Sequence, residues 1–390
     1  MENVQGKKFT SVIAIDLRPL MGVKTGVGEY TEQLARALVA CNRRPVMFFS
    51  NGSRKDVFQN PILSVPHIHT KIPNKLFDLT ARYFQRPHID VLIRNASGRE
   101  VAAFLSPHIT SAPVSRRCRK VLIVHDCSFR YRHFFSLKKQ YWHWSMAIAR
   151  TLRTADHIIA VSESTRRQIL QWLPLEPARV SVVAPGIDAS FLSPPSASVM
   201  EKVRRAYRLP PRFILFLGTR EPRKNLITLL DAFTAVAQER EIDLVIAGQA
   251  GWRNYSLNRA IARHPFRSRI HQIGYVAAAD KNALYRLSSC FLYPSLYEGF
   301  GFPPLEALAC GVPTVVSSTT SLPETVHTCA LMVDPYNSGD IAAATLFALH
   351  DQRHQERVKA EGPAYARQFQ WEKTAEKVAD CIEQVIREYA

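Results

Sequence analysis

Two glutamates separated by a glycine-rich loop are the residues of this chain whose types and spacing best support chemistry. Glu298 and Glu306 stand eight positions apart, after an apolar run at 290–293 that predicts a buried strand and around the start of a helical pattern at 305–310. Backbone N–H groups at a helix N-terminus are unpaired and carry partial positive charge, so such a loop can hold a diphosphate. A nearby carboxylate accepts hydrogen bonds from sugar and ribose hydroxyls. The combination predicts a nucleotide-sugar site; the alternative is an ordinary turn with Glu306 on a solvated helix face.

A pair of cations occupies a second turn of the same kind. Arg223 and Lys224 lie between an apolar run at 213–218 and a helical pattern at 226–238. Cations at a helix N-terminus add full charges to the helix dipole, which suits a diphosphate leaving group. Arginine grips phosphate oxygens in a fork, while lysine acts as a point charge. Arg220 lies in the same turn, so the choice between Arg220 and Arg223 stays open, with Arg223 preferred; the alternative is a basic turn exposed to solvent.

The stretch from Glu298 to Glu306, with Gly299, Gly301 and a proline pair between them, resembles the E-x7-E signature of retaining glycosyltransferases of family 4. The resemblance runs from about residue 13 to about residue 374. It implies an α/β protein of the GT-B fold, with two Rossmann-like domains whose parallel sheets face a central cleft. It also implies that Glu298 hydrogen-bonds the donor sugar and that Glu306 binds the nucleotide ribose. Thr219 departs from the family's pattern, which more often has arginine after the glycine.

The same resemblance extends to glycines and a histidine in the first half of the chain. Gly26 and Gly28 match a loop that abuts the donor diphosphate and the acceptor, and His125 matches a histidine near the donor sugar. Asp126 is a neighbour that could orient His125. A lone histidine is more often a structural hydrogen-bonding group, but His125 ends a predicted strand, at the edge where α/β sheets bind ligands. A redox dinucleotide site is a weak alternative, because Thr31 stands where the third glycine would be.

The expected site therefore has a catalytic and a substrate-binding part. The catalytic residues are expected to be Glu298, His125, Arg223 and Lys224. The substrate-binding residues are expected to be Gly26, Gly28, Asp126, Tyr275, Val276, Gly299, Phe300, Gly301, Phe302, Leu305 and Glu306. Tyr275 and Val276 enter because their segment resembles the one whose backbone contacts the nucleobase.

Composition limits the remaining classes of protein. The chain has 390 residues and 46% hydrophobic content, which favours two ordinary domains with substantial cores. No apolar segment approaches the ~18–20 residues that span a bilayer, and the run at 12–15 reads as a first strand rather than a signal peptide. Seven cysteines without a C-x-x-C pair indicate neither a disulfide framework nor a zinc site. The lack of a bilayer-spanning segment and of a signal peptide predicts a cytoplasmic protein. No Asp-x-Asp occurs, so we expect no metal and no cofactor.

The net charge of +18 and the isoelectric point near 9.8 imply an acidic partner, either nucleic acid or an anionic membrane surface. The segment 129–144 interleaves seven aromatic residues with arginines and lysines. Such a mixture suits a membrane interface, where rings lie at headgroup depth and cations meet anionic lipid. The alternative is a helix with one face in the core and the other in solvent. No recognised nucleic-acid module is present, so we expect a peripheral membrane protein on the inner face of the cytoplasmic membrane.

Short apolar runs alternate with helical patterns along the chain, as in βαβ units with a parallel sheet. We expect an acceptor-binding domain at 1–190, a nucleotide-sugar domain at 191–368 and a terminal helix at 369–390 that crosses back to the first domain. Strands are expected at 12–15, 46–49, 91–93, 103–105, 121–124, 157–161 and 180–184 in the first half. A helix is expected at 137–154, and a helix break at Gly362-Pro363.

The predicted function is transfer of a hexose with retention of configuration. The overall similarity favours mannose from GDP-mannose, moved to a glycan or polyprenyl-linked acceptor in O-antigen or exopolysaccharide assembly. A lipid-linked acceptor would explain both the basic charge and the aromatic segment. Three alternatives remain: a GT-B-like nucleotide-sugar epimerase, a nucleic-acid-binding protein, and a catalytically silent subunit that binds nucleotide sugar. The sequence leaves the oligomeric state open.

Overall fold

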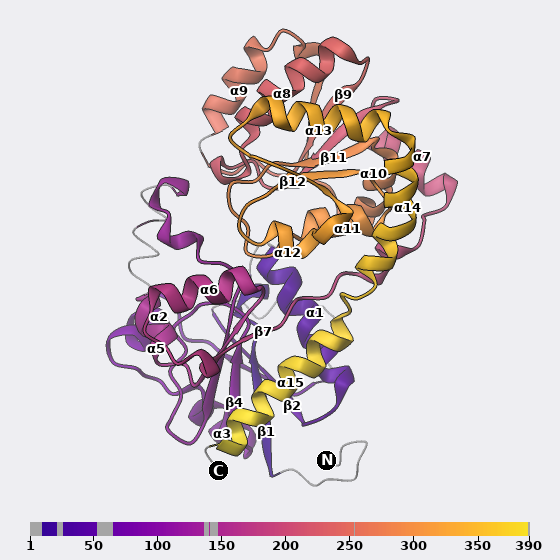
Figure 1. Cartoon of the computed structure of the whole chain (residues 1–390). Coiled ribbons are helices and arrows are strands. Elements are labelled where there is room, and N and C mark those ends of the chain that lie inside the picture. Colours follow the sequence, from indigo (N-terminus) through magenta and orange to yellow (C-terminus); the bar gives the residue numbers. More distant parts are fainter. Residues whose placement is uncertain are drawn as a thin grey trace. The chain divides into compact units, whose positions relative to one another are not determined.

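The computed structural model describes residues 10–21, 26–52, 65–135, 140, 147–252 and 254–388 (Figure 1). The chain forms two compact units. The first unit comprises Met1–Cys127, Lys138–Gly186 and Trp371–Ala390, and the second comprises Ser128–Leu137 and Ile187–Gln370. Much of the helix expected at 137–154, and the aromatic and basic residues expected at 138–139 and 141–144, lie outside the described residues.

The first unit is built on a seven-stranded parallel sheet in the order β3-β2-β1-β4-β5-β6-β7. Its strands are β1 (Ser11–Asp16), β2 (Val46–Asn51), β3 (His67–Thr70), β4 (Glu100–Ser106), β5 (Arg119–Val124), β6 (His157–Ala160) and β7 (Val180–Val182). The central strands read as apolar runs because helices cover both faces of a parallel sheet. Their carboxyl ends meet at one edge, which brings Asp16, Ser106 and His125 to the same side of the sheet.

Helices on both sides of this sheet complete the first unit (Figure 1). They are α1 (Gly26–Cys41), α2 (Asn74–Tyr83), α3 (Ile89–Ser97), α5 (Ile148–Arg153), α6 (Glu163–Trp172) and α15 (Trp371–Glu388). The last helix, α15, packs along α1, so the end of the chain belongs to the same unit as its beginning. Its apolar residues Val378, Ile382 and Val385 recur at helical spacing and are buried. Arg44 joins the two segments through an ion pair with Glu383 at 2.7 Å.

The second unit has a six-stranded parallel sheet in the order β10-β9-β8-β11-β12-β13. Its strands are β8 (Phe213–Leu217), β9 (Asp243–Ala247), β10 (Ile270–Gly274), β11 (Cys290–Tyr293), β12 (Thr314–Ser317) and β13 (Leu331–Val333). Its helices are α7 (Ala197–Ala206), α8 (Leu226–Glu239), α9 (Asn254–Arg263), α10 (Lys281–Leu287), α11 (Phe302–Ala309), α12 (Leu322–Val326), α13 (Ser338–His350) and α14 (Gln352–Ala366). Each unit is therefore Rossmann-like, as the alternation of apolar runs and helical patterns predicted.

A close approach of two backbone segments shapes the carboxyl edge of the second sheet. Gly248, directly after β9, has φ 126°, and a Cβ at that position would lie 2.0 Å from the carbonyl oxygen of Gly218. Only glycine fits here, because any side chain would collide with the backbone after β8 and strain its own. The turn that follows Gly218 is thereby held against the end of β9.

The strand expected at 91–93 is wrong, because these residues form the middle of α3. Ile89 and Ile93 are four positions apart on one helix face and both are fully buried. Val91 and Leu92 point elsewhere and are only partly buried. Three consecutive apolar residues do not distinguish a strand from a helix, and here the spacing of the buried isoleucines decides.

The helix break expected at Gly362-Pro363 is also wrong, because α14 continues through Pro363 to Ala366. Gly362 lies so close to α11 that a Cβ would be 2.6 Å from the carbonyl oxygen of Leu308. A proline removes one backbone hydrogen bond, and we attribute the continued helix to the packing of α14 on α11.

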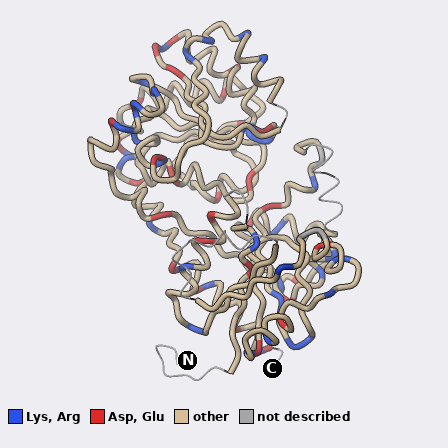
Figure 2. Tube along the Cα trace, turned by 180° about the vertical axis from the view of Figure 1, so that it is seen from behind, with Lys and Arg blue, Asp and Glu red and all other residues tan. Residues whose placement is uncertain are grey.

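The basic character of the chain is dispersed over the described residues. Figure 2 shows lysines and arginines on helices and loops of both units, interspersed with aspartates and glutamates. The net charge of +18 therefore does not come from one segment alone.

Candidate active site in the second unit

The loop between β11 and α11 carries Glu298 and is fixed by hydroxyl groups from the segment that precedes α12. The backbone N–H of Glu298 donates to Thr320 Oγ1 at 3.0 Å, and Ser321 Oγ donates to the Glu298 carbonyl at 3.0 Å. Gly301 directly precedes α11 with φ 111°, and a Cβ there would lie 2.7 Å from a methyl group of Leu322. The glycine therefore allows the loop to turn sharply against a packed side chain.

Glu298 forms two short ion pairs inside this unit. Arg223 Nη1 donates to Glu298 Oε2 at 2.8 Å, and Lys224 Nζ donates to Oε1 at 2.6 Å. The Glu298 side chain is only 9% exposed. Burial by itself would raise the pKa of this carboxyl, but the charges of Arg223 and Lys224 outweigh burial and lower its pKa to about 2. Glu298 is therefore ionised at neutral pH and oriented through both of its oxygens.

The two cations are held by further contacts that the sequence did not reveal. Arg223 Nε donates to Glu221 Oε1 at 2.9 Å, and Arg223 Nη1 also donates to the Tyr297 carbonyl at 2.7 Å. Lys224 Nζ donates to the hydroxyl of Tyr293 and lies 4.7 Å from the centre of its ring. Burial and the neighbouring arginine lower the pKa of Lys224, while Glu298 acts in the opposite direction. The contact of Glu221 could have been predicted from the sequence, because Glu221 lies in the same turn as the two cations. Nothing in the sequence indicated the contact of Tyr293.

The turn that carries these cations is the 3₁₀ helix η7 (Pro222–Lys224). Asn225 ends it in the left-handed conformation, with φ 59°. Its side-chain amide donates to the carbonyls of Pro294 at 3.1 Å and Pro335 at 2.6 Å, which offsets the backbone strain and ties the turn to the end of β11. Arg220 points elsewhere, because its guanidinium contacts the side chain of Gln272. The structure thus brings Arg223, and not Arg220, to Glu298.

Glu306 lies on α11 and is buried, so it does not occupy a solvated helix face. Tyr285 of α10 donates its hydroxyl to Glu306 Oε2 at 2.8 Å, and Glu306 is 8% exposed. Leu305 beside it is fully buried in the core. Tyr285 was not predicted, since nothing in the spacing of α10 indicates which residue meets α11.

Tyr275 and Val276, expected at the nucleobase, directly follow β10 at the carboxyl edge of the second sheet. Tyr275 is 60% exposed and Val276 is 3% exposed. Gly274 precedes them with φ 73° and accepts a hydrogen bond from the backbone N–H of Gly248 at its carbonyl. An exposed ring beside a buried anchor residue is a suitable surface for stacking a flat ligand.

The first unit contains the remaining expected residues. His125 Nε2 lies 2.7 Å from the Pro107 carbonyl, and its ring meets the edge of Tyr30 with centroids 4.5 Å apart. A carbonyl only accepts, so Nε2 carries the proton and Nδ1 is left as an acceptor. Burial lowers the pKa of His125, which keeps the imidazole neutral at pH 7. Gly26 and Gly28 form the first turn of α1, and Asp126 follows His125 in the loop after β5.

Three polar atoms near this edge have no hydrogen-bond partner within the part of the chain that the structure describes. They are Tyr30 Oη, Ser106 Oγ and His108 Nδ1. Burial lowers the pKa of His108 to about 4, against the opposing effect of Asp16. The sequence did not indicate any of the three, because isolated serines, tyrosines and histidines carry no spacing signal.

The described part of the aromatic segment packs against the second unit's own residues. Phe134 and Phe135 are 6% and 4% exposed and form an apolar cluster with Tyr297. Trp252 stacks on Phe135 and donates its indole N–H to the Phe134 carbonyl at 2.7 Å. These two rings are therefore not available to a membrane surface, and they support the residue that precedes Glu298.

Two Rossmann-like units, with paired cations and a buried carboxylate at the carboxyl edge of the second, are the architecture of GT-B glycosyltransferases. The family model for glycosyl transferases group 1 matches residues 200–365, and the model for glycosyltransferase family 4 matches residues 24–191. The chain is 30% identical over 385 residues to O-antigen chain mannosyltransferase B of Escherichia coli, across 95% of this chain and 97% of that protein. The chain belongs to glycosyltransferase family 4 and is a glycosyltransferase.

Solved structures agree on the fold. Sucrose-phosphate synthase from Thermosynechococcus elongatus superposes with a TM-score of 0.74 and 18% identity, covering 97% of this chain and 100% of that one. HepE from Anabaena, solved with UDP and glucose, gives a TM-score of 0.71 and 18% identity, covering 95% and 99%. Among the residues described, no group of three His, Cys, Asp or Glu side chains could hold a metal ion, and no helix is long and apolar enough to cross a membrane.

Proposed function

We propose that this glycosyltransferase moves mannose from GDP-mannose, with retention of configuration, to a hydroxyl of a glycan or polyprenyl-linked acceptor in O-antigen or other cell-surface polysaccharide assembly. The observation that carries the proposal is the buried cluster in which Glu298 is held by Arg223 and Lys224. The similarity to an O-antigen mannosyltransferase across nearly the whole chain supports the choice of sugar and pathway class.

In this proposal the cations serve the leaving group. Arg223 and Lys224 neutralise the charge that develops on the departing diphosphate, helped by the backbone amides of residues 299–302. No metal ion is needed for this task, because two fixed positive charges already lie next to the site. Glu298 accepts hydrogen bonds from sugar hydroxyls and shares the cations with the diphosphate, so the charge that the donor brings meets cations that are already held in place.

The other residues orient the donor. Glu306, whose position is set by Tyr285, accepts a hydrogen bond from the ribose, and Tyr275 and Val276 border the base. For His125 the family resemblance implies a contact with the donor sugar, and its neutral ring offers Nδ1 as an acceptor. Gly26, Gly28 and Asp126 complete the proposed binding set.

The bond changes follow from the absence of a nucleophilic carboxylate in the proposed set. Hydrolases that retain configuration normally form a glycosyl–enzyme intermediate on a second carboxylate. Glu298 is unsuited to that role, because both of its oxygens are engaged by cations. We therefore propose attack from the same face as the leaving group: the acceptor oxygen bonds to the anomeric carbon, the bond to the diphosphate breaks, and the departing phosphate takes the acceptor's proton.

The proposed location is the inner face of the cytoplasmic membrane, where a basic peripheral protein meets a lipid-linked acceptor. The net charge of +18 supports this association through attraction to anionic lipid. Nucleic acid is not proposed as a partner.

The decisive experiment measures binding and slow hydrolysis of GDP-, UDP- and dTDP-sugars by the wild type, Glu298→Gln and Lys224→Met, with Arg220→Gln as a charge-matched control. We expect GDP-mannose alone to be bound and cleaved, cleavage to be lost in the first two variants, and the control to match the wild type. Release of an epimerised sugar would identify an epimerase instead. Failure of every nucleotide sugar to bind at millimolar concentration would overturn the assignment of the site.

A further inference from the structure

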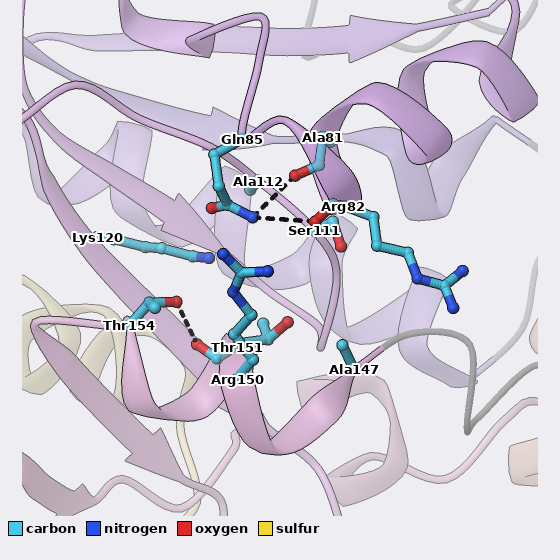
Figure 3. A pocket seen from close by; sticks show the side chains of 10 residues that line it. All are labelled: Ala81, Arg82, Gln85, Ser111, Ala112, Lys120, Ala147, Arg150, Thr151 and Thr154. Carbon is cyan, nitrogen blue, oxygen red and sulfur yellow. Dashed lines mark hydrogen bonds between the residues drawn. The ribbon is translucent and has the colours of Figure 1, made fainter.

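A pocket in the first unit is lined by three cationic side chains and no carboxylate (Figure 3). Arg82 comes from α2, Lys120 from β5 and Arg150 from α5. Gln85 and Thr151 add polar groups to its wall. None of these residues belongs to the proposed transfer site, and the pocket shares no residue with the Glu298 cluster.

Lys120 is the unusual member of this pocket. It pairs in register with Phe104 on β4, so its side chain leaves the sheet on the face of a core aromatic residue, yet it is 6% exposed. Its ammonium group forms no hydrogen bond or ion pair with any residue that the structure describes. Figure 3 shows the side chain extended into the pocket with its nitrogen toward Arg150. Asp156 is engaged by the Lys120 backbone N–H at 2.7 Å.

The surrounding charges do not compensate this cation. Burial and the charge of Arg18 together lower the pKa of Lys120 to about 8, against the opposing effects of Asp156 and Asp16. Asp16 is already bound by the Arg18 guanidinium, at 2.6 Å in its shortest contact. A buried cation without a counter-ion is unfavourable, so its presence in a polar pocket indicates a bound anion as the missing partner.

The two arginines lie nearer the surface than Lys120, because Arg82 is partly buried and Arg150 is exposed in the part of the chain that the structure describes. Neither Arg82 nor Arg150 forms an ion pair there, although Arg82 lies 5.2 Å from the ring centre of Tyr83. Figure 3 shows the Arg150 guanidinium beside the Lys120 ammonium, whereas the Arg82 side chain extends away from both. A forked guanidinium and an ammonium group side by side match oxygens of a tetrahedral phosphate. We propose that this pocket binds a phosphate group, carried either by a lipid headgroup or by a free phosphate compound.

The exposed face of α2 distinguishes these two sources. Leu76, Leu79 and Tyr83 are at least half exposed and recur at helical spacing, and Phe84 after the helix is 70% exposed. These side chains form an apolar stripe next to Arg82 on the same helix. A phosphate-bearing lipid would meet the stripe and the cations together, whereas a free phosphate would use the cations alone.

The first arm of the test uses inorganic phosphate. Thermal unfolding is followed as phosphate is added at constant ionic strength, for the wild type, Lys120→Met, Arg150→Gln and the exposed-arginine control Arg117→Gln. We expect phosphate to raise the unfolding temperature of the wild type and the control, and to have no effect on the two pocket variants. Equal responses in all four proteins would overturn the proposal, since they would show only non-specific anion binding.

The second arm uses vesicles of phosphatidylcholine alone or mixed with phosphatidic acid, in a co-sedimentation assay with the same proteins. Binding to the mixed vesicles that is lost in Arg150→Gln and kept in Arg117→Gln assigns the pocket to a lipid headgroup. A response to inorganic phosphate without vesicle binding assigns it to a free phosphate compound, and no response in either arm overturns the site. If Lys120→Met fails to fold, Arg82→Gln with Arg150→Gln gives the same readout from residues nearer the surface. Donor hydrolysis is measured in parallel and is expected to be unchanged, so failure here leaves the transferase proposal intact.

Discussion

The two clusters of cations in this protein, one around Lys224 and one around Lys120, differ in whether the chain supplies a carboxylate next to the buried lysine. In the second unit, Arg223 and Lys224 are neutralised internally by Glu298 and Glu221. In the first unit, Lys120 and the arginines beside it have no carboxylate in their pocket. We infer from this difference that Lys120 takes its counter-ion from outside the chain, whereas Lys224 has its own in Glu298.

The clusters also differ in how the chain assembles them. The cation turn and the Glu298 loop each follow a strand of one sheet, and parallel strands bring such loops together at one edge. The pocket of Lys120 is assembled from α2, β5 and α5, whose sequences share no pattern. The first cluster was therefore accessible to sequence reasoning, and the second was not.

Removing one charge from each cluster should change stability in opposite directions, and this is the largest effect we expect. Glu298→Gln leaves the buried Lys224 without a carboxylate partner and Arg223 with Glu221 alone, and should lower the free energy of unfolding by about 3 kcal/mol. Lys120→Met removes an uncompensated buried charge and should raise it by about 1 kcal/mol. Urea unfolding followed by tryptophan fluorescence measures both, and a loss of stability in both variants would contradict the contrast.

Turnover should depend on the cluster of Glu298, Arg223 and Lys224 and not on the pocket of Lys120. Lys224→Met removes a positive charge next to the leaving diphosphate and should reduce kcat by about 100- to 1,000-fold. Arg220→Gln removes the same charge from a partly buried side chain that contacts Gln272 and not Glu298, so its kcat should stay within about twofold of the wild type. Steady-state assays of sugar transfer make the comparison, and an equal loss in both variants would assign the diphosphate contact to Arg220 as well.

The two clusters should also respond to different ranges of pH. The pKa of Glu298 falls from 4.5 to about 2 on folding, so its contribution is complete above pH 4.5 and is lost as the pH falls toward 2, by about 3 kcal/mol. The pKa of Lys120 falls from 10.5 to about 8, so the folded state is penalised at neutral pH. That penalty is relieved as the pH rises from 8 to 10.5, again by about 3 kcal/mol. Unfolding free energies measured against pH should lose the acid slope in Glu298→Gln and the alkaline slope in Lys120→Met.

The smallest effect we expect concerns the orientation of Glu306. Tyr285→Phe removes one buried hydrogen bond of 2.8 Å and should weaken donor binding by about 1 kcal/mol, a several-fold rise in KM with little change in kcat. Phe291→Leu is a suitable control, because it alters a ring packed against Tyr285 without touching the hydrogen bond. A fall in kcat with unchanged KM would show that Glu306 acts in the transition state instead.

Much of the fold was predictable, because its signals are local. The apolar runs at β1, β5, β8 and β11 are long enough to mark buried parallel strands, and the turns after β8 and β11 carry their glycines and charges within a few residues. The strand predicted at 91–93 was wrong, because a run of only three apolar residues fits a helix as well as a strand. Helix α2 and strand β3 were also missed; the sequence of β3 has no alternating or continuous apolar pattern.

The amino-acid sequence by itself determined the two Rossmann-like halves, the Glu298 loop and the cation turn, because each depends on spacing within about ten residues. Tertiary structure alone decided that Arg223 and Lys224 meet Glu298 across more than seventy residues, that Tyr285 meets Glu306, and that Lys120 faces a pocket without a carboxylate. The physical reason is that hydrophobic periodicity fixes which face of an element is buried but not which partner it meets. The partner is fixed by the packing of the whole sheet and its helices, and the electrostatics of each site follow from that packing.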